Sequence, residues 1–175
     1  IRHAIAGGDF ARAADLVELS IPAMSRDRRE SVTRRWLEGL PDESIRLSPV
    51  LSDSFAGALL VHGEVEGVEG RLAVAERWLE LTGESLARDG TRPPGMVVAD
   101  EAAFRRLPAS IAVHRAGLAR ILGDEAATVA HARRALDLLG EEDHLGRGGA
   151  AALLGLTYWD GGDLEAAHQS YLEAY

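Results

Sequence analysis

The sequence has no cysteine and no lysine, and aromatic residues make up only 5% of its 175 residues. Without cysteine the chain has neither a disulfide framework nor a cysteine-ligated metal site, which fits a reducing cytoplasm. Without lysine it cannot contain the Gly-x-x-x-x-Gly-Lys-Ser/Thr loop that binds nucleotide phosphates. No apolar run approaches the roughly 20 residues that span a bilayer, and no signal peptide is visible. We therefore expect a cytoplasmic protein with no cofactor and no membrane contact.

Acidic residues outnumber basic residues, and the formal net charge is −9. A domain that binds nucleic acid normally presents a basic surface, so we expect no direct contact between this chain and DNA or RNA. All 19 basic residues are arginine, which indicates a GC-rich bacterial genome. Hydrophobic residues make up 46% of the chain and are mostly Ala, Leu and Val, a composition that suits close packing between helices.

Four of the glycines that precede an acidic residue are followed by the same apolar template, namely Gly8-Asp9, Gly63-Glu64, Gly123-Asp124 and Gly162-Asp163. Glycine readily adopts the left-handed conformation that ends a helix. The acid can cap the following helix or interact favourably with its dipole. Apolar residues then follow in steps of three and four, which places them on one helix face. Each pair therefore predicts the tight turn of a helical hairpin.

The last hairpin resembles the tetratricopeptide pattern, in which about 34 residues form one helix–turn–helix unit. Gly155 is expected to let its two helices approach closely with Ala167 opposite, while Tyr158 and Tyr171 fill the space towards neighbouring helices. Ala174 is the last member of this apolar template. The spacings predict an all-α fold, a tetratricopeptide-like superhelix of antiparallel helix hairpins (an α-solenoid).

The four turns are unevenly spaced, so we expect irregular repeats. We expect a single domain over residues 1–175, with repeat units around 1–48, 49–82, 108–140 and 148–175, and a loop or insertion at 83–107. That insertion contains a Gly- and Pro-rich stretch typical of a surface loop. The long first interval has room for an additional amphipathic helix at about 28–40 and a short helix at 42–47. The chain starts without Met, within the helical pattern, so we expect it to be part of a longer protein.

Residues 36–43 read Trp-Leu-Glu-Gly-Leu-Pro-Asp-Glu and follow the first Gly-Asp turn. This motif resembles the helical-repeat region of MalT-like regulators, which are large ATP-dependent transcriptional activators of the LuxR family. Residues 118–136 and 154–158 are similar to the next part of that region, so the resemblance covers nearly the whole chain. It implies a nucleotide-binding switch domain before this segment and a LuxR-type helix-turn-helix after it, neither of which occurs within these residues.

The resemblance implies that this segment is the central signal-sensing region of such a regulator. A region of this kind binds a small-molecule inducer or a regulatory protein, and couples that event to the ATPase and helix-turn-helix domains of the same chain. Self-association is a further expectation. The alternative function is a stand-alone tetratricopeptide scaffold that binds peptide segments of partner proteins. Both functions are binding functions, and we expect no catalysis by this segment.

Residues that could carry catalysis or hold a metal ion form no recognisable pattern. The six histidines never take the His-x-x-x-His spacing that places two imidazoles on one helix face. The acids at 141–143 are consecutive rather than spaced along a calcium loop, and no Gly-x-Ser-x-Gly nucleophile motif occurs. Surface histidines and a solvated turn at 141–143 are therefore the expected interpretation, with no catalytic and no metal-binding residue.

The tryptophans divide into two expected roles. Trp36 and Trp78 lie on apolar helix stripes and are expected in the core. In a superhelix, the first helices of the hairpins line a concave face, which is the usual working surface of solenoids. We expect a mainly apolar groove there, suited to a small molecule or a peptide, with a solvated face that binds nothing as the alternative. The expected groove residues are Trp159, Asp160, Arg120, Leu156, Leu60 and Asp53.

Overall fold

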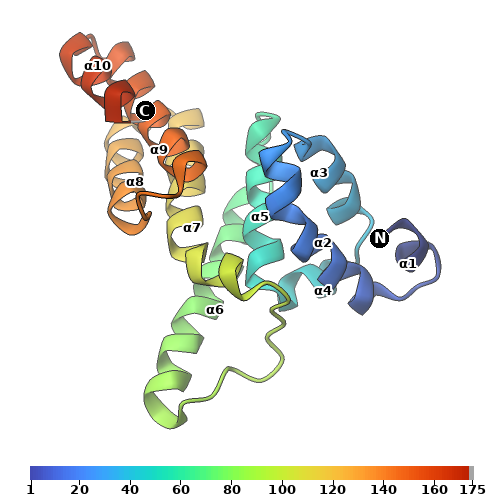
Figure 1. Ribbon diagram of the computed structural model, residues 1–175. Coiled ribbons are helices and arrows are strands. Elements are labelled where there is room, and N and C mark those ends of the chain that lie inside the picture. Colours follow the sequence, from blue (N-terminus) through green and yellow to red (C-terminus); the bar gives the residue numbers. More distant parts are fainter. Residues whose placement is uncertain (174–175) are drawn as a thin grey trace. The chain divides into compact units, whose positions relative to one another are not determined.

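Ten helices and no strand make up the regular structure of residues 1–173, the part of the chain that the computed structural model describes (Figure 1). The all-α expectation is therefore confirmed. No helix in this part is long and apolar enough to cross a bilayer. Ala174 lies outside the described residues. The helices are, in chain order, α1 (Arg2–Ala6), α2 (Phe10–Arg26), α3 (Glu30–Glu38), α4 (Asp42–Leu47), α5 (Pro49–Val61), α6 (Val68–Asp89), α7 (Glu101–Ile121), α8 (Glu125–Leu138), α9 (His144–Asp160) and α10 (Leu164–Glu173).

The chain divides into two compact units, Ile1–Leu107 and Pro108–Tyr175, where the sequence leads us to expect a single domain. Helix α7 contributes its first turns to the first unit and the remainder to the second. Pro108 stands at the division, within α7. Because proline has no backbone N–H, the helical hydrogen bond from this position is missing.

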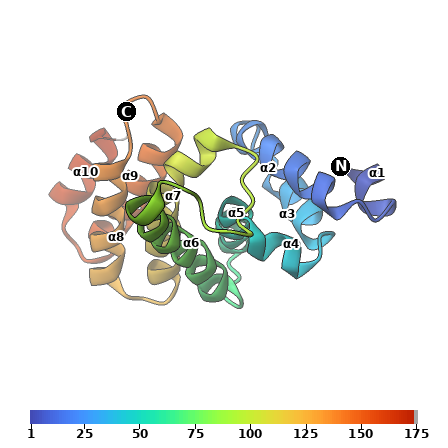
Figure 2. The ribbon, with the colours of Figure 1, turned by 90° about the horizontal axis from the view of Figure 1, so that it is seen from below.

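The first unit is built around α2, α3, α4 and α5, which lie side by side (Figure 2). Ala13, Val17, Leu37, Ile45 and Leu51 form a buried apolar cluster between them. The expected helices at 28–40 and 42–47 are present as α3 and α4. Trp36 packs against this cluster, and Trp78 of α6 donates its indole N–H to the Arg46 carbonyl oxygen at 2.7 Å. Both side chains are only partly buried, so they lie at the edge of the core, whereas the sequence predicts them inside it.

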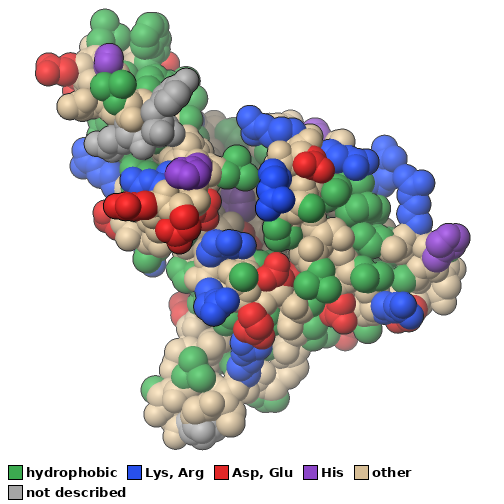
Figure 3. Space-filling model, viewed as in Figure 1, with side chains coloured by type: hydrophobic (Ala, Val, Ile, Leu, Met, Phe, Trp, Pro, Cys, Tyr) green, Lys and Arg blue, Asp and Glu red, His purple; other side chains and the backbone are tan. Residues whose placement is uncertain are grey.

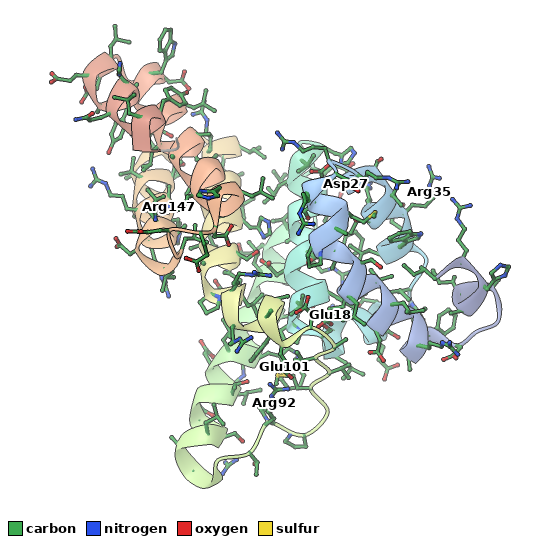
Figure 4. The ribbon with its side chains drawn as sticks, in the orientation of Figure 1. Glu18, Asp27, Arg35, Arg92, Glu101 and Arg147 are labelled. Atoms are coloured by element: carbon green, nitrogen blue, oxygen red, sulfur yellow. The ribbon has the colours of Figure 1, made fainter. Side chains whose placement is uncertain are left out.

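The connection between α6 and α7 is shorter than the expected insertion at 83–107. Helix α6 continues to Asp89 and α7 begins at Glu101, so only residues 90–100 lie between them. Arg92 binds Glu101 across this connection, with a distance of 2.7 Å from Nη1 to Oε1 (Figure 4). The backbone N–H of Val97 donates to the Leu47 carbonyl oxygen at 2.8 Å. Apolar positions within 83–89 and 101–107 continue the helical period, and the Gly/Pro signal applies only to the centre of the segment.

A buried carboxylate holds the end of this connection against α2. Glu18 is 1% exposed and accepts hydrogen bonds from the backbone N–H groups of Ala99 (2.8 Å) and Asp100 (2.9 Å) and from the Ser48 hydroxyl (2.7 Å). Figure 4 shows it on α2 beside the start of α7. Burial raises the pKa of Glu18 above its ordinary value, although these donors act in the opposite direction. Glu18 therefore positions the segment that leads into α7.

The raised pKa of Glu18 gives the stability of the chain a specific pH dependence. Its charge weakens the folded state increasingly as pH rises from about 4.3, the ordinary glutamate pKa, through the folded pKa. Glu18→Gln keeps an oxygen for the two backbone donors and removes the charge. We therefore expect the unfolding free energy of Glu18→Gln, relative to wild type, to increase between pH 4 and pH 8 in urea titrations. A difference that stays constant, or that falls with pH, contradicts this assignment.

All four predicted Gly-acid turns join consecutive helices, and each glycine has a positive φ: 74° at Gly8, 72° at Gly63, 76° at Gly123 and 80° at Gly162. Three of the acids cap the next helix as expected. Asp9, Asp124 and Asp163 accept hydrogen bonds from the backbone N–H three residues later, at 3.3, 2.9 and 3.0 Å. At these three positions both the predicted glycine turn and the predicted helix cap are present.

The turn at Gly63 differs from the other three. Glu64 does not cap α6 but binds Arg34 of α3, with a distance of 2.6 Å between Nη1 and Oε1. Helix α6 begins only at Val68, after a second left-handed glycine, Gly67, with φ of 79°. Val65 therefore lies in the turn and is exposed, and it does not belong to the apolar face of α6. Because the Glu64 carboxylate binds Arg34 of another helix, it does not cap α6.

Candidate binding site

In the second unit, α9 packs between α8 and α10 (Figure 1). Small residues fill the space between the helices: Ala116, Ala132, Ala135 and Ala150 are fully buried. Arg147 of α9 extends across to α8, where its Nη1 donates to the Leu136 and Leu139 carbonyl oxygens at 3.3 and 3.4 Å (Figure 4). The alanine contacts allow the helix backbones to approach closely. Leu154 is buried in the same contacts, and Val113, Val129 and Leu136 pack against them.

Gly155 has a different neighbour from the one expected. The ring of Tyr171, not Ala167, covers it: a Cβ atom at position 155 would lie 2.5 Å from Tyr171 Cζ. Ala167 is buried between α9 and α10. Tyr158 accepts a hydrogen bond from Arg133 at 2.7 Å through its hydroxyl, so it binds towards α8. Because Gly155 has no side chain, the Tyr171 ring packs directly on α9 at this position.

Two glycines of α9 provide a matched test of this contact. Gly155→Ala places a methyl group where the Tyr171 ring lies, and overpacking of this kind costs about 1–3 kcal/mol. Gly148→Ala has no neighbouring atom within 4 Å, so the higher helix propensity of alanine should stabilise the chain by up to about 1 kcal/mol. Chemical denaturation measures both. Opposite signs are expected, and Gly155→Ala should lose its penalty when Tyr171→Ala is also present. Two stabilising substitutions, or a penalty that persists in the double variant, would refute the contact.

Four of the six predicted groove residues belong to the second unit. Arg120 of α7 and Asp160 of α9 form an ion pair, with a distance of 2.6 Å from Nη2 to Oδ2. Trp159 and Leu156 are exposed on α9, and Trp159 is 63% exposed. The structure therefore brings Arg120 and Asp160 together. Trp159, which directly precedes Asp160 in the sequence, is exposed to solvent.

The other two predicted residues, Leu60 and Asp53, lie on α5 in the first unit. Leu60 is partly buried, and Asp53 is only 3% exposed. A side chain with so little accessible surface offers a ligand almost nothing to contact. The spacing along α5 predicts on which helix face Asp53 lies, but it does not predict that this side chain is buried.

A polar cavity of about 290 Å³ lies beside the Arg120–Asp160 pair. It is lined by Arg120, Gly123, Glu125, Thr128 and Asp160. The positive charge of Arg120 is already balanced by Asp160, and the Thr128 hydroxyl donates to the Asp124 carbonyl oxygen at 2.7 Å. This cavity can accept hydrogen bonds from a ligand, but the charges of Arg120 and Asp160 are already paired with each other.

A second cavity, of about 330 Å³, is a mainly apolar groove on the last hairpin. We call it the α10 groove, and it is lined by Trp159, Leu164, Ala167, His168, Tyr171 and Leu172. Leu164 and Leu172 are each 59% exposed. Figure 3 shows hydrophobic side chains at the surface over α10. A solvent-facing aromatic ring beside large aliphatic side chains is a feature of binding surfaces.

Trp159 is predicted from the sequence as a groove residue, whereas Leu164, His168 and Leu172 of the α10 groove are not. Leu164, His168 and Leu172 are four residues apart and form one row on α10. The row is readable in the sequence, because together with Ala167 and Tyr171 it forms one apolar stripe at i, i+3, i+4, i+7 and i+8. Ala167 is buried at the edge that packs on α9, whereas Leu164 and Leu172 are exposed and line the groove.

No family model, curated protein or solved structure matches this chain. Within residues 1–173, no three His, Cys, Asp or Glu side chains gather in a way that could hold a metal ion. The chemistry available in the α10 groove is apolar contact, aromatic stacking on Trp159 and Tyr171, and hydrogen bonding at His168.

Proposed function

We propose that this chain is a non-catalytic recognition module and that it binds an inducer or a partner protein in the α10 groove. The observation that carries the proposal is the exposed Trp159 beside the exposed Leu164 and Leu172. Binding energy in protein surfaces is concentrated in a few aromatic and aliphatic side chains that lose contact with water on binding. In the free chain these side chains remain in contact with water, so a ligand that covers them gains the favourable free energy of removing apolar surface from water.

At a finer level, we propose a tetratricopeptide-like superhelix that serves as the sensor region of a MalT-like, LuxR-family regulator. The support is the sequence motif at 36–43 together with the Gly-acid hairpin turns. Leu37 and Leu40 of the motif are buried, and Asp42 binds Arg71 of α6 at 2.6 Å. These residues hold α3 and α4 in the first unit, so the motif maintains the fold and leaves binding to other positions. Ligand binding would then act by favouring one of two states of the whole protein.

A stand-alone scaffold for peptide segments is the second candidate. The α10 groove favours it in one respect, because the groove runs along a helix and is shallow rather than enclosed. The two candidates differ in what flanks this segment in its gene. A phosphate-binding loop upstream and a helix-turn-helix downstream would support the regulator, whereas their absence would support the scaffold.

Trp159→Ala tests the recognition function. A thermal-shift screen of wild type with sugars, amino acids and small metabolites should find at least one compound that raises the melting temperature. Such a ligand stabilises the fold by about 2.7 kcal/mol at a hundredfold excess over its Kd. Trp159→Ala should abolish the shift and leave the melting temperature of the free chain nearly unchanged, because its indole is mostly exposed.

Trp36→Ala is the matched control for the loss of an indole. Trp36 packs on the buried cluster of the first unit, so this substitution should cost about 3 kcal/mol or more and leave ligand binding by the folded protein intact. If Trp159→Ala instead unfolds the chain, or binds the same ligand as tightly as wild type, the α10 groove is not the recognition site.

A further inference from the structure

Helix α10 has one apolar stripe, and α9 covers only one edge of it. Leu164, Ala167, His168, Tyr171 and Leu172 stand at i, i+3, i+4, i+7 and i+8, the spacing of one amphipathic helix face. Ala167 is buried at the edge that packs on α9. Leu164 and Leu172 are each 59% exposed and line the α10 groove together with Trp159. The exposed edge of the stripe is where another molecule can gain apolar contact.

The geometry of this stripe suits a helix. Leu164 and Leu172 are two helical turns apart, which is about 12 Å along the axis. Small-molecule sites enclose most of the ligand surface, whereas the α10 groove is shallow and follows α10. A partner helix with apolar residues at every third or fourth position presents a stripe of the same length and period. Ala167 at the floor of the groove gives space for one large apolar side chain of that partner.

The charged residues nearest the groove along the chain are acidic. Residues 148–172 contain no Arg or Lys but three acidic residues, Asp160, Asp163 and Glu165. Glu165 is exposed and precedes Leu172 by two helical turns, so it flanks the stripe. Arg120, from α7, is paired with Asp160. An acidic border attracts a partner that carries Arg or Lys and repels an acidic one. Two copies of this hairpin would bring like charges together, which disfavours self-association through this face.

We propose that the α10 groove binds an amphipathic helix of a partner protein, with an apolar stripe flanked by Arg or Lys. This proposal rests on the recognition function above and specifies its ligand. Apolar side chains of the partner cover Trp159, Leu164 and Leu172, and its basic side chains lie opposite Glu165 and Asp163. His168, in the middle of the row, provides a hydrogen-bonding group within the apolar contact.

The test uses the full 175-residue chain and synthetic helical peptides of about 18 residues, roughly 27 Å long. One peptide has Leu at every third or fourth position with Lys on both flanks. A second replaces each Lys by Glu, and a third keeps the Lys and replaces each Leu by Ser. Fluorescence anisotropy should show binding of the Leu/Lys peptide that is at least about tenfold tighter than that of either control, and salt should weaken it.

Two exposed leucines provide matched variants. Leu172→Ser should weaken binding of the Leu/Lys peptide about tenfold, while Leu138→Ser, on the exposed end of α8, should leave it unchanged. Glu165→Lys should weaken the Leu/Lys peptide about threefold at low salt and strengthen the Leu/Glu peptide similarly. Circular dichroism melting checks that all three variants fold.

Each other outcome overturns the proposal. Equal binding of the Lys and Glu peptides removes the charge argument, and equal loss with Leu172→Ser and Leu138→Ser removes the site. Absence of binding by all peptides removes the helix as ligand, yet a metabolite that stabilises wild type and not Trp159→Ala would still support the recognition function. Concentration-dependent dimerisation that Leu172→Ser abolishes, measured by sedimentation, would show that a second copy of the chain occupies the groove.

Discussion

The hairpins of this chain depend on helix backbones coming close enough for alanine to fill the space between them. In the second unit the helix contacts are made by Ala116, Ala132, Ala135, Ala150 and Ala167, all of which are buried. Such contacts bury little apolar area per residue, so they need the backbones to be held in position by tight turns. The left-handed glycines and the aspartate caps provide those turns. Leu154, which is 4% exposed, is buried in the same contacts, and the larger side chains of Val129, Leu136 and Tyr158 pack against them.

This constraint explains why the α10 groove exists. The side of α10 that packs on α9 is small, with Ala167 and Ser170, and the large residues Leu164 and Leu172 project beside it. Tyr171 stays at the margin by lying over Gly155, the point where α9 has no side chain of its own. Ala167 packs on α9, and Leu164 and Leu172 remain exposed at the other edge of the same apolar stripe. On the function proposed above, this exposed edge is where a partner would gain apolar contact.

The first unit uses polar groups for a comparable purpose. Residues 90–100 are held by Glu18, whose buried carboxylate receives two backbone hydrogen bonds and one from Ser48. Burial of the charge opposes folding, and the hydrogen bonds from Ala99 and Asp100 offset that cost. Replacement by an apolar residue would leave both backbone N–H groups without an acceptor. The start of α7 therefore depends on a residue 82 positions earlier in the chain.

The sequence predicts local features of this fold better than contacts between helices. The four glycine turns and the helices at 28–40 and 42–47 follow from conformational preference and apolar period, and all of them are present. The role of Glu64 depends on Arg34 in another helix, and the burial of Asp53 depends on tertiary packing, so local spacing predicts neither. For the binding site, the residue type of Trp159 is enough to predict it. The row Leu164, His168 and Leu172 is present in the sequence pattern but is not among the predicted groove residues. Gly155 was recognised as a point of close approach, but the identity of its neighbour was set by tertiary packing.

The central claim is that the surface around Trp159 is open to solvent in the free chain and covered when a partner binds. Its most direct measurement is the acrylamide quenching of Trp159 fluorescence, obtained as the difference between wild type and Trp159→Phe. In the free chain this difference spectrum should be red-shifted and strongly quenched, as expected for an indole that is 63% exposed. Saturation with a bound partner should shift it to the blue and reduce quenching. A blue-shifted, weakly quenched Trp159 in the free chain would contradict the account, because the surface would already be covered by the protein itself.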